Sequence, residues 1–404
     1  MTSRPGVTVE AAPSVPEWAE ELPQQQRGSG EAISYALMMK GALTACLIVL
    51  TVITVVQWLG TPVNLPTSDT PQRRFVRVKN PDGSWGTKQA AAEDDPIEAL
   101  TLSEDLRYRG HLAGVWRLAL APGGGKLLSG SSDGTLRMWQ TFSGQPQLKI
   151  ERPGAIVLDV AFNADGSRGA CASTTGVLVF DVATGDTIFE LNELPELVNA
   201  VAFSPADGLL AAGNEAGRVT LYSSQGEPVR QWDAIAEIYQ LAFTPDGSRL
   251  VTATAESTVR VWNPTTKQQE ATLVGHASGV HSVAVSPDGQ RILTGGKDGT
   301  LREWDLSRAR ELSKLEAHDQ TIEAVAFSAA GHFAASGGRD AQLRVWNLDT
   351  GKEVGRAPKQ RGPVFGIVFT PDGLSLASSC TADTEMVLWR VRTGNDDSTL
   401  PGKQ

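Results

Sequence analysis

The stretch Leu293–Asp305, LTGGKDGTLREWD, combines the signals on which the architecture of this chain depends. It predicts a strand, a tight Asp298-Gly299 turn and a second strand that ends at an aromatic residue. Related copies place their aromatics at Trp139, Phe180, Tyr222, Trp262, Trp304, Trp346 and Trp389. These are separated by 41, 42, 40, 42, 42 and 43 residues, and so regular a period indicates an array of equivalent units.

Each unit carries the signals of four short strands. An alternating apolar strand such as Val280–Val285 comes first, and a Pro-Asp-Gly turn at Ser286–Gly289 follows it. Two strands flank the Asp-Gly turn, and a polar strand such as Glu311–Leu315 completes the unit. Because four short strands cannot bury both of their faces alone, the units must stack on one another.

Composition and charge exclude several functional classes. The 404-residue chain has a net charge of −10, which leaves no basic field for a phosphate backbone, so nucleic acid is not an expected partner. The three cysteines, Cys46, Cys171 and Cys380, show the spacing of neither a disulfide framework nor a metal site. We therefore expect no metal and no cofactor. Nucleophile-elbow, zinc-protease and phosphate-loop motifs are missing from the sequence, so we expect no enzymatic activity.

The N-terminal segment predicts a membrane anchor. Residues 1–30 are rich in Pro, Glu, Gln, Gly and Ser, and we expect them to be a disordered tail. Residues 31–60 are expected to form a single transmembrane helix, because Gly41–Gly60 runs for twenty residues without a charge. Residues 61–94 are predicted to be a linker, with a short hairpin around Val78–Trp85.

A cleaved signal peptide is the alternative to a membrane anchor. The forty residues before the apolar run hold five acidic and three basic side chains, unlike the n-region of a signal peptide.

The orientation of the anchor follows from the basic residues around it. Basic residues between Arg73 and Lys79 follow the span, and the positive-inside rule then favours a cytoplasmic location for the repeats. Lys40 is the only basic residue at the membrane edge itself, so the opposite side stays open.

Several units also carry residue pairs that are typical of a known repeat. Gly110-His111, Gly275-His276 and Trp304-Asp305 are such pairs, and seven units stand in phase. Residues 95–395 therefore resemble a WD-repeat β-propeller. The resemblance implies an all-β fold, and the seven aromatics imply a seven-bladed β-propeller of four-stranded blades, with residues 396–404 as a flexible C-terminus.

The last unit lacks its fourth strand. The chain after Trp389 is short and polar, whereas Ala99–Tyr108 before the first unit is a spare strand. We expect this strand to complete blade 7, because the ring then closes without an open edge.

The resemblance also implies a buried hydrogen-bonded set in the blades. The members that it assigns are His111, Asp133 and Trp139 in blade 1, His276, Asp298 and Trp304 in blade 5, His318, Asp340 and Trp346 in blade 6, and Asp383 and Trp389 in blade 7. Blades 2, 3 and 4 lack the Gly-His pair and the turn aspartate. We expect these three blades to depend more on apolar packing.

The candidate binding residues are those that differ between units. The second residue of each opening strand gives Trp116, Leu158, Asn199, Tyr239, His281, Glu323 and Phe365. Their neighbours stay apolar in every unit, whereas this position varies widely. In the resembled family the corresponding positions line the channel mouth, where peptides insert. Trp116 and Phe365 are expected to be neighbours across the ring closure, as are Tyr239 and His281.

These observations favour a membrane-anchored scaffold that binds a protein or peptide partner through its channel mouth. Aromatic residues at the rim of a pocket are common anchors of such interfaces. One alternative is an extracytoplasmic propeller that binds a small molecule or sugar, or a degraded propeller enzyme. A purely structural spacer is another, and the seven variable residues could also be ordinary half-buried side chains at a strand start.

Overall fold

The computed structural model describes residues 75–79, 85–89, 99–192 and 194–393. These residues form strands and turns, and no helix that could cross a bilayer occurs among them. The disordered tail (1–30), the transmembrane helix (31–60) and the flexible C-terminus (396–404) that the sequence predicts fall outside the described residues.

The chain divides into two compact units, Met1–Ala91 and Ala92–Gln404. In the first unit, β1 (Phe75–Lys79) pairs antiparallel with β2 (Trp85–Gln89), and Phe75 lies opposite Gln89. The predicted hairpin is therefore present, with longer arms than the sequence suggested.

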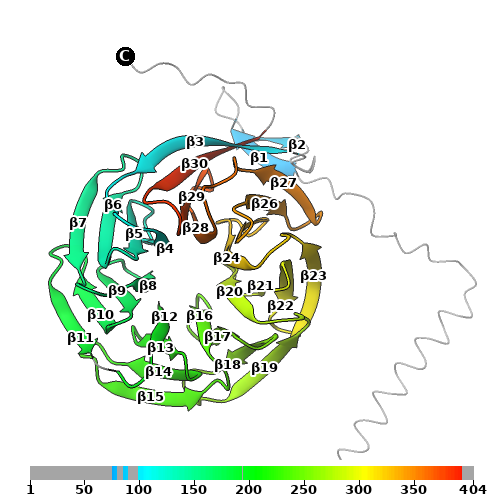
Figure 1. The fold of residues 1–404 in the computed structure, drawn as a ribbon. Coiled ribbons are helices and arrows are strands. Elements are labelled where there is room, and N and C mark those ends of the chain that lie inside the picture. Colours follow the sequence, from blue (N-terminus) through cyan, green and yellow to red (C-terminus); the bar gives the residue numbers. More distant parts are fainter. Residues whose placement is uncertain (1–74, 80–84, 90–98, 193, 394–404) are drawn as a thin grey trace, which may run out of the picture. The chain divides into compact units, whose positions relative to one another are not determined.

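The second unit is a ring of seven antiparallel four-stranded sheets, which confirms the seven-bladed propeller (Figure 1). The innermost strands surround the centre, and they are β4 (Val115–Leu120), β8 (Val157–Phe162), β12 (Val198–Phe203), β16 (Ile238–Phe243), β20 (Val280–Val285), β24 (Ile322–Phe327) and β28 (Val364–Phe369). The second strands are β5 (Lys126–Ser131), β9 (Arg168–Ser173), β13 (Leu210–Asn214), β17 (Leu250–Thr254), β21 (Arg291–Gly296), β25 (Phe333–Gly338) and β29 (Ser375–Cys380).

The outer half of each blade holds the strand-end aromatic and an edge strand. The third strands are β6 (Thr135–Gln140), β10 (Gly176–Asp181), β14 (Arg218–Tyr222), β18 (Thr258–Trp262), β22 (Thr300–Asp305), β26 (Leu343–Asn347) and β30 (Met386–Thr393). The outermost strands are β7 (Pro146–Glu151), β11 (Thr187–Asn192), β15 (Pro228–Asp233), β19 (Gln269–Val274), β23 (Arg310–Glu316), β27 (Lys352–Arg356) and β3 (Leu100–Tyr108). The outermost strands are largely solvent-exposed, as their polar sequences require.

The ring closes as predicted, because the strand before blade 1 supplies the outer strand of blade 7. β3 pairs antiparallel with β30, with Leu100 opposite Thr393 and Tyr108 opposite Met386. Tyr108 is fully buried, its ring lies 5.9 Å from that of Trp139, and its hydroxyl donates to the carbonyl of Thr141 at 2.5 Å. The first part of the propeller therefore fastens its last blade.

The hydrophobic core is divided into seven layers, one between each pair of neighbouring blades. Each strand-end aromatic lies in the layer between its own blade and the preceding one. Trp304 of blade 5, for example, packs with Val251, Val261 and Leu273 of blade 4. Because every blade buries its aromatic against the blade before it, no unit has a complete core of its own.

A chain of hydrogen bonds fixes the aromatic of blade 5. His276 Nδ1 lies 3.0 Å from the Asp298 carboxylate, which can only accept, so Nδ1 carries the proton. His276 Nε2 then accepts from the hydroxyl of Thr294 at 2.8 Å, and Thr294 Oγ1 accepts from Trp304 Nε1 at 2.8 Å. Burial lowers the pKa of His276, which favours this neutral form.

The same arrangement recurs in blades 1 and 6. His111 contacts Asp133 and Ser129 at 3.0 and 2.8 Å, and Trp139 donates to Ser129 at 2.9 Å. In blade 6 the corresponding set is His318, Asp340, Ser336 and Trp346, with a His318–Asp340 distance of 2.9 Å.

Blade 7 keeps only part of this set. Trp389 donates to Ser378 at 2.8 Å, but Asp383 accepts from the backbone N–H of Glu385 instead of a histidine. Blade 4 likewise keeps only a Trp262–Thr252 bond, at 3.1 Å. In blades 4 and 7 the tryptophan therefore keeps a hydroxyl partner although the histidine is missing.

Removal of the closing strand is expected to destabilise the whole ring. Deletion of residues 96–108 exposes the edge of β30 and the core around Trp139, so the thermal midpoint should fall. Tyr108→Ala should lower the free energy of unfolding by about 3–5 kcal/mol, because it removes a fully buried aromatic ring. Deletion of residues 396–404 is the control. An unchanged midpoint after deletion of residues 96–108 would contradict the closure of the ring by β3.

Candidate functional site

The seven variable residues occupy equivalent positions, one per blade, at one end of the central channel. We call them the rim residues, and the end of the ring that carries them the mouth face; they are Trp116, Leu158, Asn199, Tyr239, His281, Glu323 and Phe365. In every blade the register between the first two strands shifts at this residue, so that it has no partner in the ladder. A β-bulge of this kind re-aims a side chain without changing the strands around it.

The first pair of rim residues meets across the ring closure. The rings of Trp116 and Phe365 pack edge to face, with their centroids 4.8 Å apart. Trp116 Nε1 also donates to Ser132 Oγ at 2.6 Å, which fixes the indole against the turn of its own blade. Both side chains are half-buried, so they form an ordered aromatic step at the mouth.

The second pair belongs to a polar group that extends over three blades. The rings of Tyr239 and His281 lie 4.5 Å apart, and His281 Nδ1 lies 3.0 Å from Glu323 Oε2. The other oxygen of Glu323 accepts from Arg339 Nε. Glu323 is only 3% exposed, so it acts as a buried acceptor beneath the rim and is not free to meet a partner directly.

The remaining rim residues are separate from these groups. Asn199 Nδ2 donates to Glu237 Oε1 and to the carbonyl of Ile238, at 3.2 and 3.1 Å. Leu158 is half-buried on the blade between Trp116 and Asn199. The mouth therefore has an aromatic side at blades 7 and 1 and a charged side at blades 4 to 6.

A polar layer below the rim escaped the sequence analysis. It lies one residue further along the innermost strands, where Arg117 donates to the carbonyls of Glu323 and Phe365 at 2.9 and 2.6 Å. Asp159 Oδ2 accepts from the backbone N–H of Val201 in the next blade at 2.9 Å. These contacts tie blade 1 to blades 6 and 7, and blade 2 to blade 3, inside the channel. The available signal was a charge in the middle of an otherwise apolar strand.

Continuing around the channel, the same layer links blades 4, 5 and 6. Gln240 Oε1 of blade 4 accepts two hydrogen bonds from β20 of blade 5. One comes from the hydroxyl of Ser282 at 2.8 Å, and the other comes from the backbone N–H of Val283 at 3.0 Å. Ser282 Oγ in turn accepts from the backbone N–H of Val325 at 3.0 Å. These polar side chains below the rim are therefore engaged in bonds that hold the ring together.

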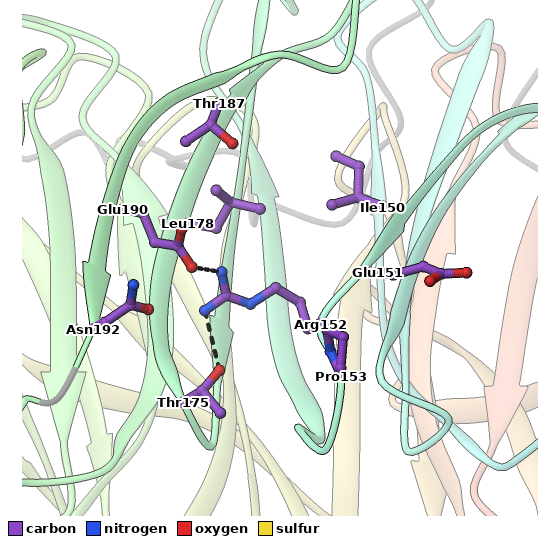
Figure 2. A pocket seen from close by; sticks show the side chains of 9 residues that line it. All are labelled: Ile150, Glu151, Arg152, Pro153, Thr175, Leu178, Thr187, Glu190 and Asn192. Atoms are coloured by element: carbon purple, nitrogen blue, oxygen red, sulfur yellow. Dashed lines mark hydrogen bonds and ion pairs between the residues drawn. The ribbon is translucent and has the colours of Figure 1, made fainter.

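An arginine stands where the structural histidine is expected in blade 2. Arg152 precedes Phe180 by 28 residues, as His111 precedes Trp139. Its guanidinium donates to Thr175 Oγ1 at 3.1 Å and pairs with Glu190, beside a hollow of about 300 Å³ (Figure 2). The Arg152 side chain is 7% exposed. Its ion pair with Glu190 joins the segment after β7 of blade 1 to β11 of blade 2, where other blades have the histidine set.

The described residues contain no group of three His, Cys, Asp or Glu side chains that could hold a metal ion. Cys171 and Cys380 are both free and buried, and burial raises the pKa of Cys171 to about 12. What the mouth face offers instead is aromatic surface, charge and hydrogen-bonding groups, which suit the binding of a polypeptide.

The buried carboxyl of Asp159 should leave a pH signature in stability. Burial raises its pKa to about 6, against the charge of Arg117 and two backbone N–H groups. Since the folded pKa lies above the unfolded one, its contribution is full below about pH 4 and is lost as pH rises through about 6. Relative to wild type, Asp159→Asn should therefore gain up to about 3 kcal/mol of unfolding free energy between pH 4 and 7.

Urea unfolding at the two pH values measures this difference. The exposed turn residue Asp186, changed to Asn, is the matched control. A free-energy difference between Asp159→Asn and wild type that does not vary with pH would contradict the assignment.

Comparison with known proteins agrees with the ring geometry. The family described as WD domain, G-beta repeat, matches residues 103–140, 226–263, 267–305 and 309–347. Each match contains the outer strand of one blade and the first three strands of the next, which is the same offset that closes the ring. The matches end at blades 1, 4, 5 and 6, each of which keeps a tryptophan.

Several curated proteins are similar to part of the chain. Apoptotic protease-activating factor 1 of Danio rerio is 28% identical over 160 residues, which cover 38% of this chain and 12% of that protein. Eukaryotic translation initiation factor 3 subunit I of Coccidioides immitis is 28% identical over 176 residues, 38% of this chain and 52% of that protein. Human striatin-4 is 28% identical over 166 residues, 38% of this chain and 22% of that protein.

The chain therefore spans between 12% and 52% of the length of these three relatives. Four matched repeats and seven four-stranded blades together support a place for this chain among the WD-repeat propellers.

Proposed function

We propose that this protein is a membrane-anchored scaffold whose propeller binds a protein or peptide partner through its mouth face. The observation that carries the proposal is the rim itself. Seven equivalent register shifts place seven chemically different side chains around one opening, and six of them, all but the buried Glu323, are half-buried at its surface. The fold requires the same bulge in every blade, but it does not require a different side chain in each. Recognition of a partner would explain why the side chains differ.

The loops around the rim add exposed apolar surface to this face. Leu112 and Ile235 each follow the position of the structural histidine in their blade, and they are 83% and 64% exposed. Ile235 also has a φ of 81°, a conformation that a β-branched side chain rarely adopts. Strain of this kind persists where the surroundings enforce it, often at binding sites, and exposed apolar groups favour a protein partner.

The relatives support binding over catalysis. One of them is named as a subunit of a translation initiation factor, which indicates assembly with other chains. We therefore propose that this chain catalyses no reaction itself and acts by holding its partner.

The membrane anchor is the second part of the proposal. Gly41–Gly60 is long and apolar enough to cross the hydrocarbon core once, and residues 61–94 would connect it to the ring. The basic residues after the span favour a cytoplasmic propeller. A scaffold anchored in this way would concentrate its partner at the membrane surface.

Substitution of the aromatic step should weaken partner capture. Trp116→Ala with Phe365→Ala removes the packed pair, and crosslinking pull-down should recover at least about tenfold less of the partners held by wild type, as expected for aromatic anchors. Phe142→Ala is the control, because Phe142 is 58% exposed in the β6–β7 turn at the opposite end of the blade. Identical partner profiles for wild type and the double variant would reject the mouth face as the binding surface.

Protease treatment of intact cells should leave the propeller uncut if it is cytoplasmic. The same treatment after permeabilisation should then cleave exposed turns. Cleavage in intact cells would place the ring outside the cytoplasm and exclude cytoplasmic partners, and recovery of the protein in the soluble fraction would contradict the anchor.

A further inference from the structure

The charged side of the mouth face contains a hollow of about 600 Å³ over blade 5. Blades 4, 5 and 6 all contribute to its lining. The side chains that matter are Tyr239, Ser257, Ser278, His281, Lys297 and Arg339. Part of the rim thus lies in its wall, and two basic residues stand on the turns around it.

The lining of this hollow carries two cationic side chains. Lys297 is exposed and makes no ion pair with any residue in the described ranges. Arg339 is half exposed, and its Nε donates to Glu323, whose side chain is 4% exposed beneath the rim. The ammonium of Lys297 is therefore available to a ligand, and Glu237 beside Tyr239 is the nearby acidic group on the blade 4 side.

The backbone holds both basic residues in place. The N–H of Lys297 donates to the carbonyl of Gly279 at 2.8 Å, and that of Arg339 donates to Thr321 at 2.9 Å. At Gly279 a Cβ atom would lie 2.8 Å from the carbonyl oxygen of Ala255, so the wall of the hollow requires glycine there. Because the turns are fixed, less order has to be created when a ligand binds.

The blades on one side of the hollow carry acidic side chains. Glu196 and Glu215 lie on the loops and turns of blade 3, and Glu237 lies on blade 4 beside Tyr239; none of them pairs with a cation within the described part of the chain. An anionic group that approaches the mouth is therefore repelled from the side of blades 3 and 4 and attracted by Lys297 and Arg339 on blades 5 and 6. Such a field orients a charged ligand as well as attracting it.

Hydrogen-bond donors complete the site. The hydroxyls of Ser257 and Ser278 line the hollow and make no hydrogen bond with another described residue. Together with the ammonium of Lys297 and the remaining N–H groups of Arg339, they can donate to an oxygen anion. A carboxylate carries one negative charge and a phosphate nearly two, and the charge of Glu237 beside Tyr239 disfavours the more highly charged group.

We propose that this hollow binds the carboxylate of an aspartate or glutamate side chain in the protein or peptide partner. The proposal rests on the proposed function and adds the chemistry of the partner to it. Lys297 and Arg339 supply the charge, the serines supply neutral donors, and the stacked Tyr239 and His281 form the wall. The aromatic step at Trp116 and Phe365 then holds an apolar part of the same partner.

Retention of defined peptide pools by the immobilised full-length protein tests this proposal. Each pool of capped octapeptides has one position fixed as a single residue and the others mixed. Wild type should retain pools with Asp or Glu about fivefold better than the matched Asn or Gln pools, as expected for an exposed charge pair. Lys297→Glu should reverse the preference towards Lys and Arg pools. Lys352→Glu, on the outer strand β27, is the control and should keep the acidic preference.

The outcomes separate this proposal from the function on which it rests. Equal retention of acidic and amide pools, with loss of both in the Trp116→Ala/Phe365→Ala variant, would reject the carboxylate site and keep the mouth face. Stronger retention of phosphoserine pools than of Glu pools would also overturn the choice of a carboxylate. If wild type retains no pool, both proposals fail. An unchanged thermal midpoint for Lys297→Glu shows that any reversal reflects binding and not unfolding.

Discussion

The packing of one aromatic side chain against the preceding blade is the interaction on which the whole structure depends. A single four-stranded sheet of this size leaves both faces in water, and burial of an aromatic on a neighbour removes a large apolar area from solvent. Since each of the seven aromatics is buried in this way, stability belongs to the interfaces and not to the units. The ring is then the arrangement that leaves no aromatic without a neighbour.

The hydrogen-bonded sets refine this packing unevenly around the ring. In blades 1, 5 and 6 a histidine, a carboxylate and a hydroxyl fix the tryptophan, whereas blade 2 uses the Arg152–Glu190 pair and a phenylalanine. A buried polar set is favourable only when every member is satisfied, and Arg152 Nε has no partner among the described residues. The ring is therefore symmetrical in its backbone and asymmetrical in how firmly its blades are held.

Most of the fold could be predicted from the sequence, because the period, the turns and the spare strand at Ala99–Tyr108 are local signals. The two predicted aromatic neighbours, Trp116 with Phe365 and Tyr239 with His281, followed from equivalence between units and are present. The contacts of Arg117 with Glu323 and Phe365 could not be predicted, because they end on backbone carbonyls, whose direction the pattern of residues does not show. The burial of Glu323 was missed because its partners His281 and Arg339 lie on the neighbouring blade and on a turn, and the position of a residue in its own strand does not reveal them.

The bulge at the rim has a consequence for how such a protein can change. A residue without a ladder partner can be replaced without altering the register of its strand, so the fold places little restriction on its chemistry. Under the proposed function, recognition and folding belong to adjacent positions of the same strand, so that substitutions in one need not be compensated in the other. The six half-buried rim residues, all but Glu323, then give a surface on which new specificities can arise by single substitutions, by natural drift or in a combinatorial library.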